Sequence, residues 1–107
     1  MNAWIILSFA ILCEVSAATA LKYSAISGSK IFIVGFVLLM VVSFAIFYQA
    51  IKTIDLSIAY AVWAGVGLVI VSCVGFVVFR EQVSAIKILC IALILIGVVG
   101  LKLLSKA

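Results

Sequence analysis

Glu14 is the residue whose chemistry most needs an explanation, because it is a carboxylate inside a long apolar stretch. In a helix that begins at Ala3, Glu14 lies about 16 Å along the axis, near the middle of a hydrocarbon core of about 30 Å. An ionised carboxylate at this depth is costly unless it is paired or reaches water, and burial favours the neutral form. Glu14 is therefore predicted to bind and release protons. The alternative is a permanently protonated group that holds two helices together.

The residues three and four positions from Glu14 lie beside it on a helix. They are Ala10, Ile11, Ala17 and Ala18. Small side chains either allow another helix to approach closely or leave a cavity for a bulky ligand. A ligand site at Glu14 is predicted to include the three alanines.

Tyr60, Trp63 and Gly67 follow one another at intervals of three and four residues, so they share one helix face. Aromatic faces attract cations by about 0.5–2 kcal/mol each. Near a carboxylate, this pair would suit a hydrophobic cation. The competing interpretation is an interfacial aromatic belt, which explains Tyr60, near the start of its segment, better than the deeper Trp63.

Four apolar segments must position these groups, over residues 3–21, 31–51, 57–79 and 83–104. Each is long enough to cross the bilayer core as a helix, and none alternates polar with apolar residues as membrane β-strands do. The segments leave no room for a soluble domain, so residues 1–107 are predicted to form one all-α transmembrane domain. Short connections make consecutive helices antiparallel neighbours in an up-and-down bundle.

The composition also indicates a membrane protein, since 70% of the residues are hydrophobic and 9% are charged. A soluble domain has roughly 45–50% and about 25%, respectively. The net charge of +4 comes from scattered basic residues that suit anionic lipid headgroups and form no cluster for nucleic acid. With three cysteines in apolar runs and no histidine, neither a metal site nor an enzyme is predicted.

Glycine must supply any helix kink, because the chain contains no proline. The predicted flexing point is Gly65 and Gly67. The last segment carries Cys90 and Gly97, small residues on an otherwise bulky apolar sequence. Such positions are typical of helix–helix contacts in membranes, and these two are predicted to contact a second copy of the chain.

The basic residues are almost evenly divided between the two predicted sides of the membrane. One side carries Lys52, Lys102 and Lys106, and the other carries Lys22, Lys30 and Arg80, with Lys87 near the same boundary. Because orientation follows an imbalance of Lys and Arg, the chain is predicted to insert both ways and to form antiparallel dimers. The alternative is a single topology set by the weak excess on the second side.

Four short spans, a lone Glu14 and the run SIAYAVWAGVG over residues 57–67 together resemble the small multidrug resistance family. The similarity includes Glu14-Val15 and the later Leu21-Lys22-x-Ser24, and it extends over nearly the whole chain. The resemblance implies an antiparallel, dual-topology homodimer in the prokaryotic plasma (inner) membrane. It implies that protons and a cationic substrate exclude one another at Glu14, with no cofactor beyond the proton gradient.

The resemblance also suggests roles for other residues. Tyr60 and Trp63 match the substrate-site aromatics of the family, and Ser43 matches a polar position near that site. Gly65 and Gly67 match the glycines of a flexing third helix. The fourth helix would supply the dimer contact, where the family often has glycine at the position of Cys90.

The substrate branch is indicated by the neighbours of Glu14. The guanidinium-exporting branch typically has tryptophan three residues after the glutamate and glycine three before, where this chain has Ala17 and Ile11. This favours export of quaternary ammonium and other lipophilic cations, although that branch often has glycine at the position of Ala17. The alternatives are a guanidinium exporter, one half of a heterodimeric pair, a membrane assembly subunit that transports nothing, and a passive cation pore.

Overall fold

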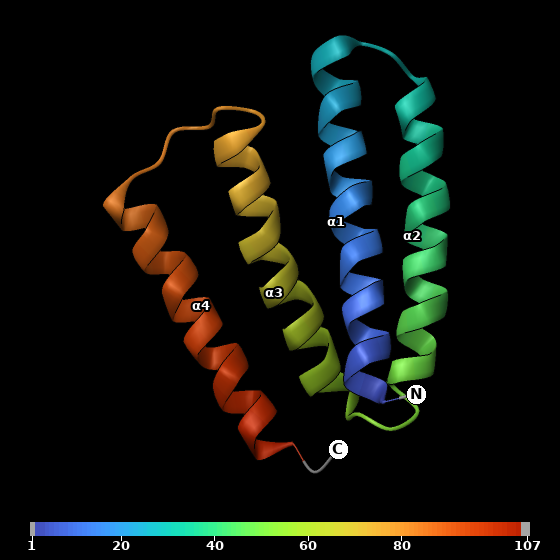
Figure 1. Cartoon of the computed structure of the whole chain (residues 1–107), viewed down its shortest axis with the longest axis vertical. Coiled ribbons are helices and arrows are strands. Elements are labelled where there is room, and N and C mark those ends of the chain that lie inside the picture. Colours follow the sequence, from blue (N-terminus) through green and yellow to red (C-terminus); the bar gives the residue numbers. More distant parts are fainter. Residues whose placement is uncertain (1, 106–107) are drawn as a thin grey trace.

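The computed structural model describes residues 2–105, which form four α-helices. They are α1 (Ala3–Ser27), α2 (Ile31–Ala50), α3 (Leu56–Val77) and α4 (Ala85–Leu104). Figure 1 shows consecutive helices running in opposite directions, with both ends of the chain at the same end of the molecule. Each helix is long and apolar enough to cross a membrane, and residues 2–105 contain no strand. The predicted all-α, four-span fold is confirmed.

Helix α1 is longer than predicted, and the expected loop over residues 22–30 is mostly helical. The helix ends where Gly28 adopts a φ of 77°, a left-handed conformation that glycine takes without strain. The Gly28 amide donates to the carbonyl oxygen of Ser24 at 2.9 Å and closes the helix end. The extension places Glu14 almost halfway between Ala3 and Ser27, so its expected position at mid-membrane is retained.

The connection between α3 and α4 is longer than the predicted turn over residues 80–82. Helix α3 ends at Val77 and α4 begins at Ala85, because Ser84 caps α4 by accepting the Lys87 amide at 3.2 Å. The Glu81 amide also folds back to the Gly75 carbonyl oxygen at 2.9 Å. Apolar residues at these ends extended the predicted spans, since hydrophobicity alone does not show where a cap stops a helix.

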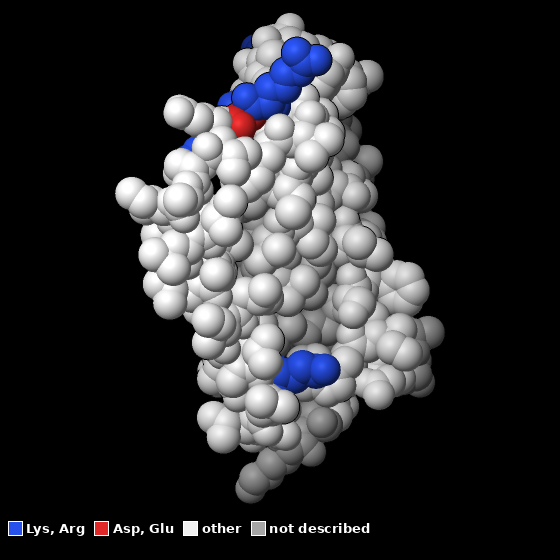
Figure 2. Space-filling model, turned by 60° about the vertical axis from the view of Figure 1, so that its left-hand side comes forward, with Lys and Arg blue, Asp and Glu red and all other residues white. Residues whose placement is uncertain are grey.

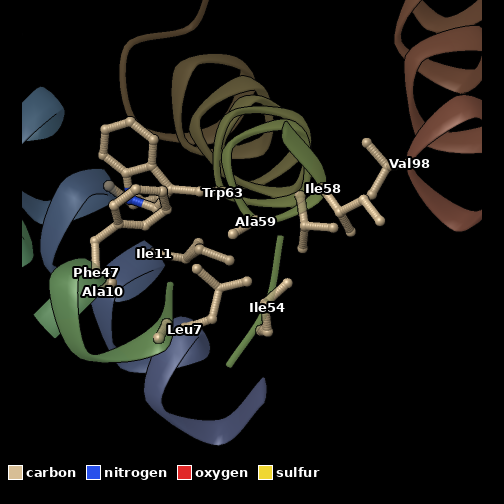
Figure 3. Close-up of a cluster of buried hydrophobic side chains, with 12 residues drawn as sticks. Leu7, Ala10, Ile11, Phe47, Ile54, Ile58, Ala59, Trp63 and Val98 are labelled. Atoms are coloured by element: carbon tan, nitrogen blue, oxygen red, sulfur yellow. The ribbon is translucent and has the colours of Figure 1, made fainter. Parts of the chain in front are cut away.

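Helix α1 lies between α2 and α3, and α4 packs on the far side of α3 (Figure 1). Ala10 and Ala17 of α1 and Ala50 of α2 have no exposed surface, so small side chains bring these helices into close contact. Figure 3 shows the buried cluster that joins α1, α2 and α3, with Val98 reaching toward it from α4. Val98 is the one buried residue within α4. Helix α4 is therefore peripheral to this core.

Apart from Glu14, the charged side chains of residues 2–105 lie toward the two ends of the helices. Figure 2 shows blue and red atoms at one end, blue atoms near the other, and an uncharged band between them on this face. Two lysines lie over aromatic rings: the Nζ of Lys52 is 5.0 Å from the Tyr48 ring centroid, and that of Lys102 is 5.3 Å from the Trp4 centroid. These ends suit the two membrane surfaces, where lysine ammonium groups reach water and headgroups.

Candidate functional site

The Glu14 side chain lies against α3 at Gly67. A methyl group built on Gly67 would stand 2.5 Å from the Oε2 atom of Glu14 and 3.4 Å from its carboxyl carbon. Oε2 is buried and has no hydrogen-bond partner among residues 2–105. A buried, unpartnered oxygen is costly and is rare in folded proteins. This arrangement leaves the acid without the partner that an ionised carboxylate would need at Oε2.

The alanines predicted around Glu14 have two different environments. Ala10 and Ala17 have no exposed surface and lie seven residues apart, on the face of α1 that meets α2. Ala18 is partly buried. Of the two uses predicted for small residues, Ala10 and Ala17 show close helix packing. Their predicted contact with a ligand stays a prediction.

Ser43 of α2 is completely buried, and its hydroxyl donates to the carbonyl oxygen of Ala10 at 2.7 Å. Ala10 is also four residues before Glu14, so the same carbonyl is the helical acceptor for the Glu14 amide. Ser43 thus joins α2 to the turn of α1 that carries Glu14. Its hydroxyl proton is used in this contact, and the predicted role of Ser43 near the ligand stays a prediction.

Replacing Ser43 by alanine should remove one interhelical hydrogen bond and weaken the α1–α2 pair. In membrane proteins such bonds contribute on average about 0.6 kcal/mol, so a small decrease in the free energy of unfolding is expected, with cation affinity unchanged within about twofold. Unfolding in mixed detergent and cation titration of Ser43→Ala beside the wild type measure the two quantities. A large loss of affinity in a stably folded variant would instead assign Ser43 to ligand contact.

Trp63 of α3 is the centre of an aromatic cluster that also includes two rings of α2. Its ring centroid lies 5.3 Å from Phe44, 5.3 Å from Phe47 and 5.4 Å from Tyr60. Figure 3 shows the Trp63 and Phe47 rings side by side. Trp63 is 6% exposed and its Nε1 has no hydrogen-bond partner among residues 2–105, whereas Tyr60 is 53% exposed. The two predicted aromatics therefore lie together, one buried and one accessible.

Phe44 and Phe47 were not among the predicted site residues. Phe47 follows Ser43 by one helical turn, and this spacing is the signal that places it on the same buried face of α2. The contact with Trp63 needed the structure, because the pattern within either helix does not show that side chains of α2 and α3 meet.

Gly65 and Gly67 face different helices. A methyl group on Gly65 would collide with the Cγ2 atom of Val98 on α4, whereas one on Gly67 would meet Glu14 on α1. Helix α3 is continuous through both glycines. Each glycine thus has a packing partner of its own, and their predicted role in flexing stays a prediction.

Cys90 and Gly97 of α4 are exposed, and nothing lies within 4 Å of a methyl group built on Gly97. Their predicted contact with a second copy stays a prediction. Among the described residues no group of three His, Cys, Asp or Glu side chains could hold a metal ion.

The fold and the site define a class of protein: a multi-pass membrane protein with a carboxyl group midway along its first helix, whose Oε2 atom has no hydrogen-bond partner among residues 2–105, and with an aromatic cluster on α2 and α3. A sequence model described as Small Multidrug Resistance protein matches residues 2–94. The chain belongs to the small multidrug resistance family. It is therefore a transporter of a bacterial inner-membrane family whose members carry small cationic substrates and form oligomers.

Individual relatives cover almost the whole chain. An uncharacterized membrane protein of Bacillus subtilis, YvaE, is 41% identical over 95% of this chain and 86% of its own length. A second protein of that organism, YvdR, is 38% identical over 98% of this chain and 99% of its own length. The guanidinium exporter of Escherichia coli is 39% identical over 94% of this chain and 95% of its own length.

Proposed function

We propose that this chain exports hydrophobic and quaternary ammonium cations in exchange for protons, and that the two compete for Glu14. The observation that carries the proposal is the buried Oε2 atom of Glu14, which lies against α3 without a hydrogen-bond partner among the described residues. Trp63 is one helical turn before Gly67 and Tyr60 is two turns before it. The acid and the aromatic rings therefore lie along one face of α3.

Competition at one carboxyl group is sufficient to couple the two fluxes. A protonated Glu14 is neutral and offers a cation no charge, whereas an ionised Glu14 attracts one. A cation that binds inside must therefore displace the proton, and a proton that arrives outside must displace the cation. Cation affinity is accordingly expected to rise with pH, as fewer protons compete.

The surroundings of Glu14 favour hydrophobic cations over guanidinium. Guanidinium presents N–H donors around its whole edge and needs several acceptors. Ser43 has no exposed surface, so its hydroxyl oxygen is out of reach of a ligand at the site, and Trp63 offers only a donor. The aromatic faces, by contrast, attract any cation without hydrogen bonds. Of the side chains of Glu14, Ser43, Tyr60 and Trp63, only the carboxylate of Glu14 and the hydroxyl of Tyr60 then offer guanidinium an acceptor.

Guanidinium export is the second candidate, and one observation favours it. A relative named as a guanidinium exporter is 39% identical over nearly the full length of both chains. That name describes the relative, and a comparison of proton release by the two cation types distinguishes the two candidates for this chain.

An antiparallel homodimer is the proposed working unit, with a heterodimeric pair as the alternative. The balance of basic residues between the two ends supports insertion in both orientations. Reporter fusions at the C-terminus should then detect it on both sides of the membrane, and two lysines added at one end should shift the population to a single orientation. A single orientation in the unmodified chain would contradict dual insertion.

Proton release from purified protein in unbuffered solution tests the proposed function. Adding tetraphenylphosphonium should acidify the solution in proportion to the protein, and guanidinium should release fewer protons at equal concentration. Release by guanidinium alone would favour the second candidate. A wild-type protein that releases no protons with either cation would contradict proton-coupled exchange and favour a non-transporting assembly role or a passive pore.

A further inference from the structure

Gly67 has a property that a general helix-flexing role does not require: it faces the carboxyl group of Glu14. The nearest atoms to a methyl group on Gly67 are Oε2, the carboxyl carbon and Oε1 of Glu14, at 2.5, 3.4 and 3.7 Å. All three belong to one side chain. The absence of a Cβ atom on α3 therefore makes the space that this carboxyl group occupies.

The space suits a neutral carboxyl group better than an ionised one. Oε2 is buried and without a hydrogen-bond partner within residues 2–105, and an ionised oxygen in such surroundings loses its solvation without compensation. A protonated carboxyl group loses far less on the same transfer. The position of the Glu14 carboxyl group and its charge state are therefore linked at this contact with α3.

No charged side chain belongs to either helix packed against this part of α1. Neither α2 nor α3 contains Asp, Glu, Lys or Arg. Their titratable groups are Tyr48 on α2 and Tyr60 and Cys73 on α3. On α1 itself they are Cys13, Lys22 and Tyr23. Lys22 is eight residues from Glu14, about 12 Å along the helix, so the charge at this contact changes with the protonation of Glu14 itself.

We propose that Gly67 is a positioning residue that holds the protonated form of Glu14 against α3, and that the ionised form moves off this contact to meet a cation. Gly67 thereby strengthens proton binding in the competition between proton and cation. The cation half of this inference rests on the proposed function, whereas the proton half depends only on the contact between α1 and α3.

Gly65 is a matched control on the same helix. A methyl group there meets Val98 of α4 and lies away from Glu14. If the two glycines serve only to flex α3, Gly65→Ala and Gly67→Ala should act alike. If Gly67 positions the carboxyl group, only Gly67→Ala should change the titration of Glu14.

The test is an infrared pH titration of the protein in lipid, without any cation substrate. The carbonyl band of the protonated Glu14 carboxyl is identified as the band that is lost in Glu14→Gln. In Gly67→Ala this band should disappear at a pH lower by about half a unit or more, because overpacking penalises the protonated position. Gly65→Ala should titrate as the wild type does. Equal titration in all three proteins, or equal shifts in both alanine variants, would overturn the proposal.

Shortening the acid provides a rescue that a purely structural effect would not show. Aspartate is one methylene shorter and does not reach the methyl group, so Gly67→Ala should cause no further shift in the Glu14→Asp background. An additive shift there would overturn the proposal. The Gly67→Ala and Gly65→Ala proteins must keep wild-type helicity and elution. If Gly67→Ala alone does not fold, the Glu14→Asp Gly67→Ala protein should fold, because the shorter acid leaves room for the methyl group. Failure of both proteins to fold would overturn the proposal.

Tetraphenylphosphonium affinity supplies the second readout. Gly67→Ala should bind the cation about threefold or more tightly at about pH 6 and equally at about pH 9, where proton competition is weak. Weaker binding at both values would contradict the inference. Cation binding without pH dependence in the wild type would refute the proposed function alone, and the infrared titration would still decide the role of Gly67.

Discussion

Replacing Glu14 by glutamine should abolish both cation-driven proton release and proton-driven cation transport. Glutamine keeps the shape of the side chain but cannot ionise. At an effective dielectric constant of about 20, two unit charges about 4 Å apart attract by about 4 kcal/mol, so cation affinity should fall by more than about a hundredfold. Proton release after addition of tetraphenylphosphonium, and its pH-driven movement in liposomes, measure the two effects.

Glu14→Asp is the matched variant, because it retains the acid and changes only its reach. It should release protons on cation addition, with a changed affinity. A further control is Glu81→Gln, since Glu81 lies in the exposed connection between α3 and α4. Cation-driven proton release that persists in Glu14→Gln would show that another group exchanges the proton.

Replacing Trp63 by leucine should reduce the affinity for aromatic and quaternary cations by about tenfold to thirtyfold, because a desolvated cation–π contact contributes up to about 2 kcal/mol. Leucine keeps apolar volume at a position that is 6% exposed, so the helix packing is disturbed less than by alanine. Equilibrium titration with tetraphenylphosphonium at a pH where Glu14 is ionised measures the loss.

Trp63→Phe separates the aromatic face from the indole N–H. Phenylalanine retains a ring but lacks the donor at Nε1, which has no hydrogen-bond partner within residues 2–105. Its affinity should stay within about fivefold of the wild type, since the ring still attracts the cation. An unchanged affinity in Trp63→Leu would remove Trp63 from the binding site, and equal large losses in both variants would indicate that the N–H is the essential group.

Most of the fold could be predicted from the sequence, because four apolar segments of this length have few alternatives in a bilayer. The residues at which individual helices begin and end could not be predicted. The end of α1 depends on the conformation of Gly28, and the start of α4 depends on the cap at Ser84. Lys22 and Tyr23 interrupt the hydrophobic run of α1 without interrupting its backbone hydrogen bonds, since lysine and tyrosine extend from a helix toward the membrane surface.

The candidate site could also be predicted only in part. Residue type and spacing alone predict that Glu14 is an acid in mid-membrane and that Tyr60 and Trp63 share a helix face. The residues that contact these side chains could not be predicted from the sequence. Gly65 and Gly67 are two residues apart, and only the arrangement of the helices shows that one meets α4 and the other meets Glu14. Nor does the sequence show that the hydroxyl of Ser43 donates to the carbonyl oxygen of Ala10 on another helix.

By itself the sequence determined the membrane environment, the number of spans and the presence of one acid deep in an apolar segment, because these depend on the free energy of placing each side chain in lipid. The tertiary structure decided which small residues pack helices and which one makes room for the acid. The physical reason is that periodicity specifies which face of a helix a residue occupies, whereas the neighbour on that face depends on contacts between segments distant in the chain.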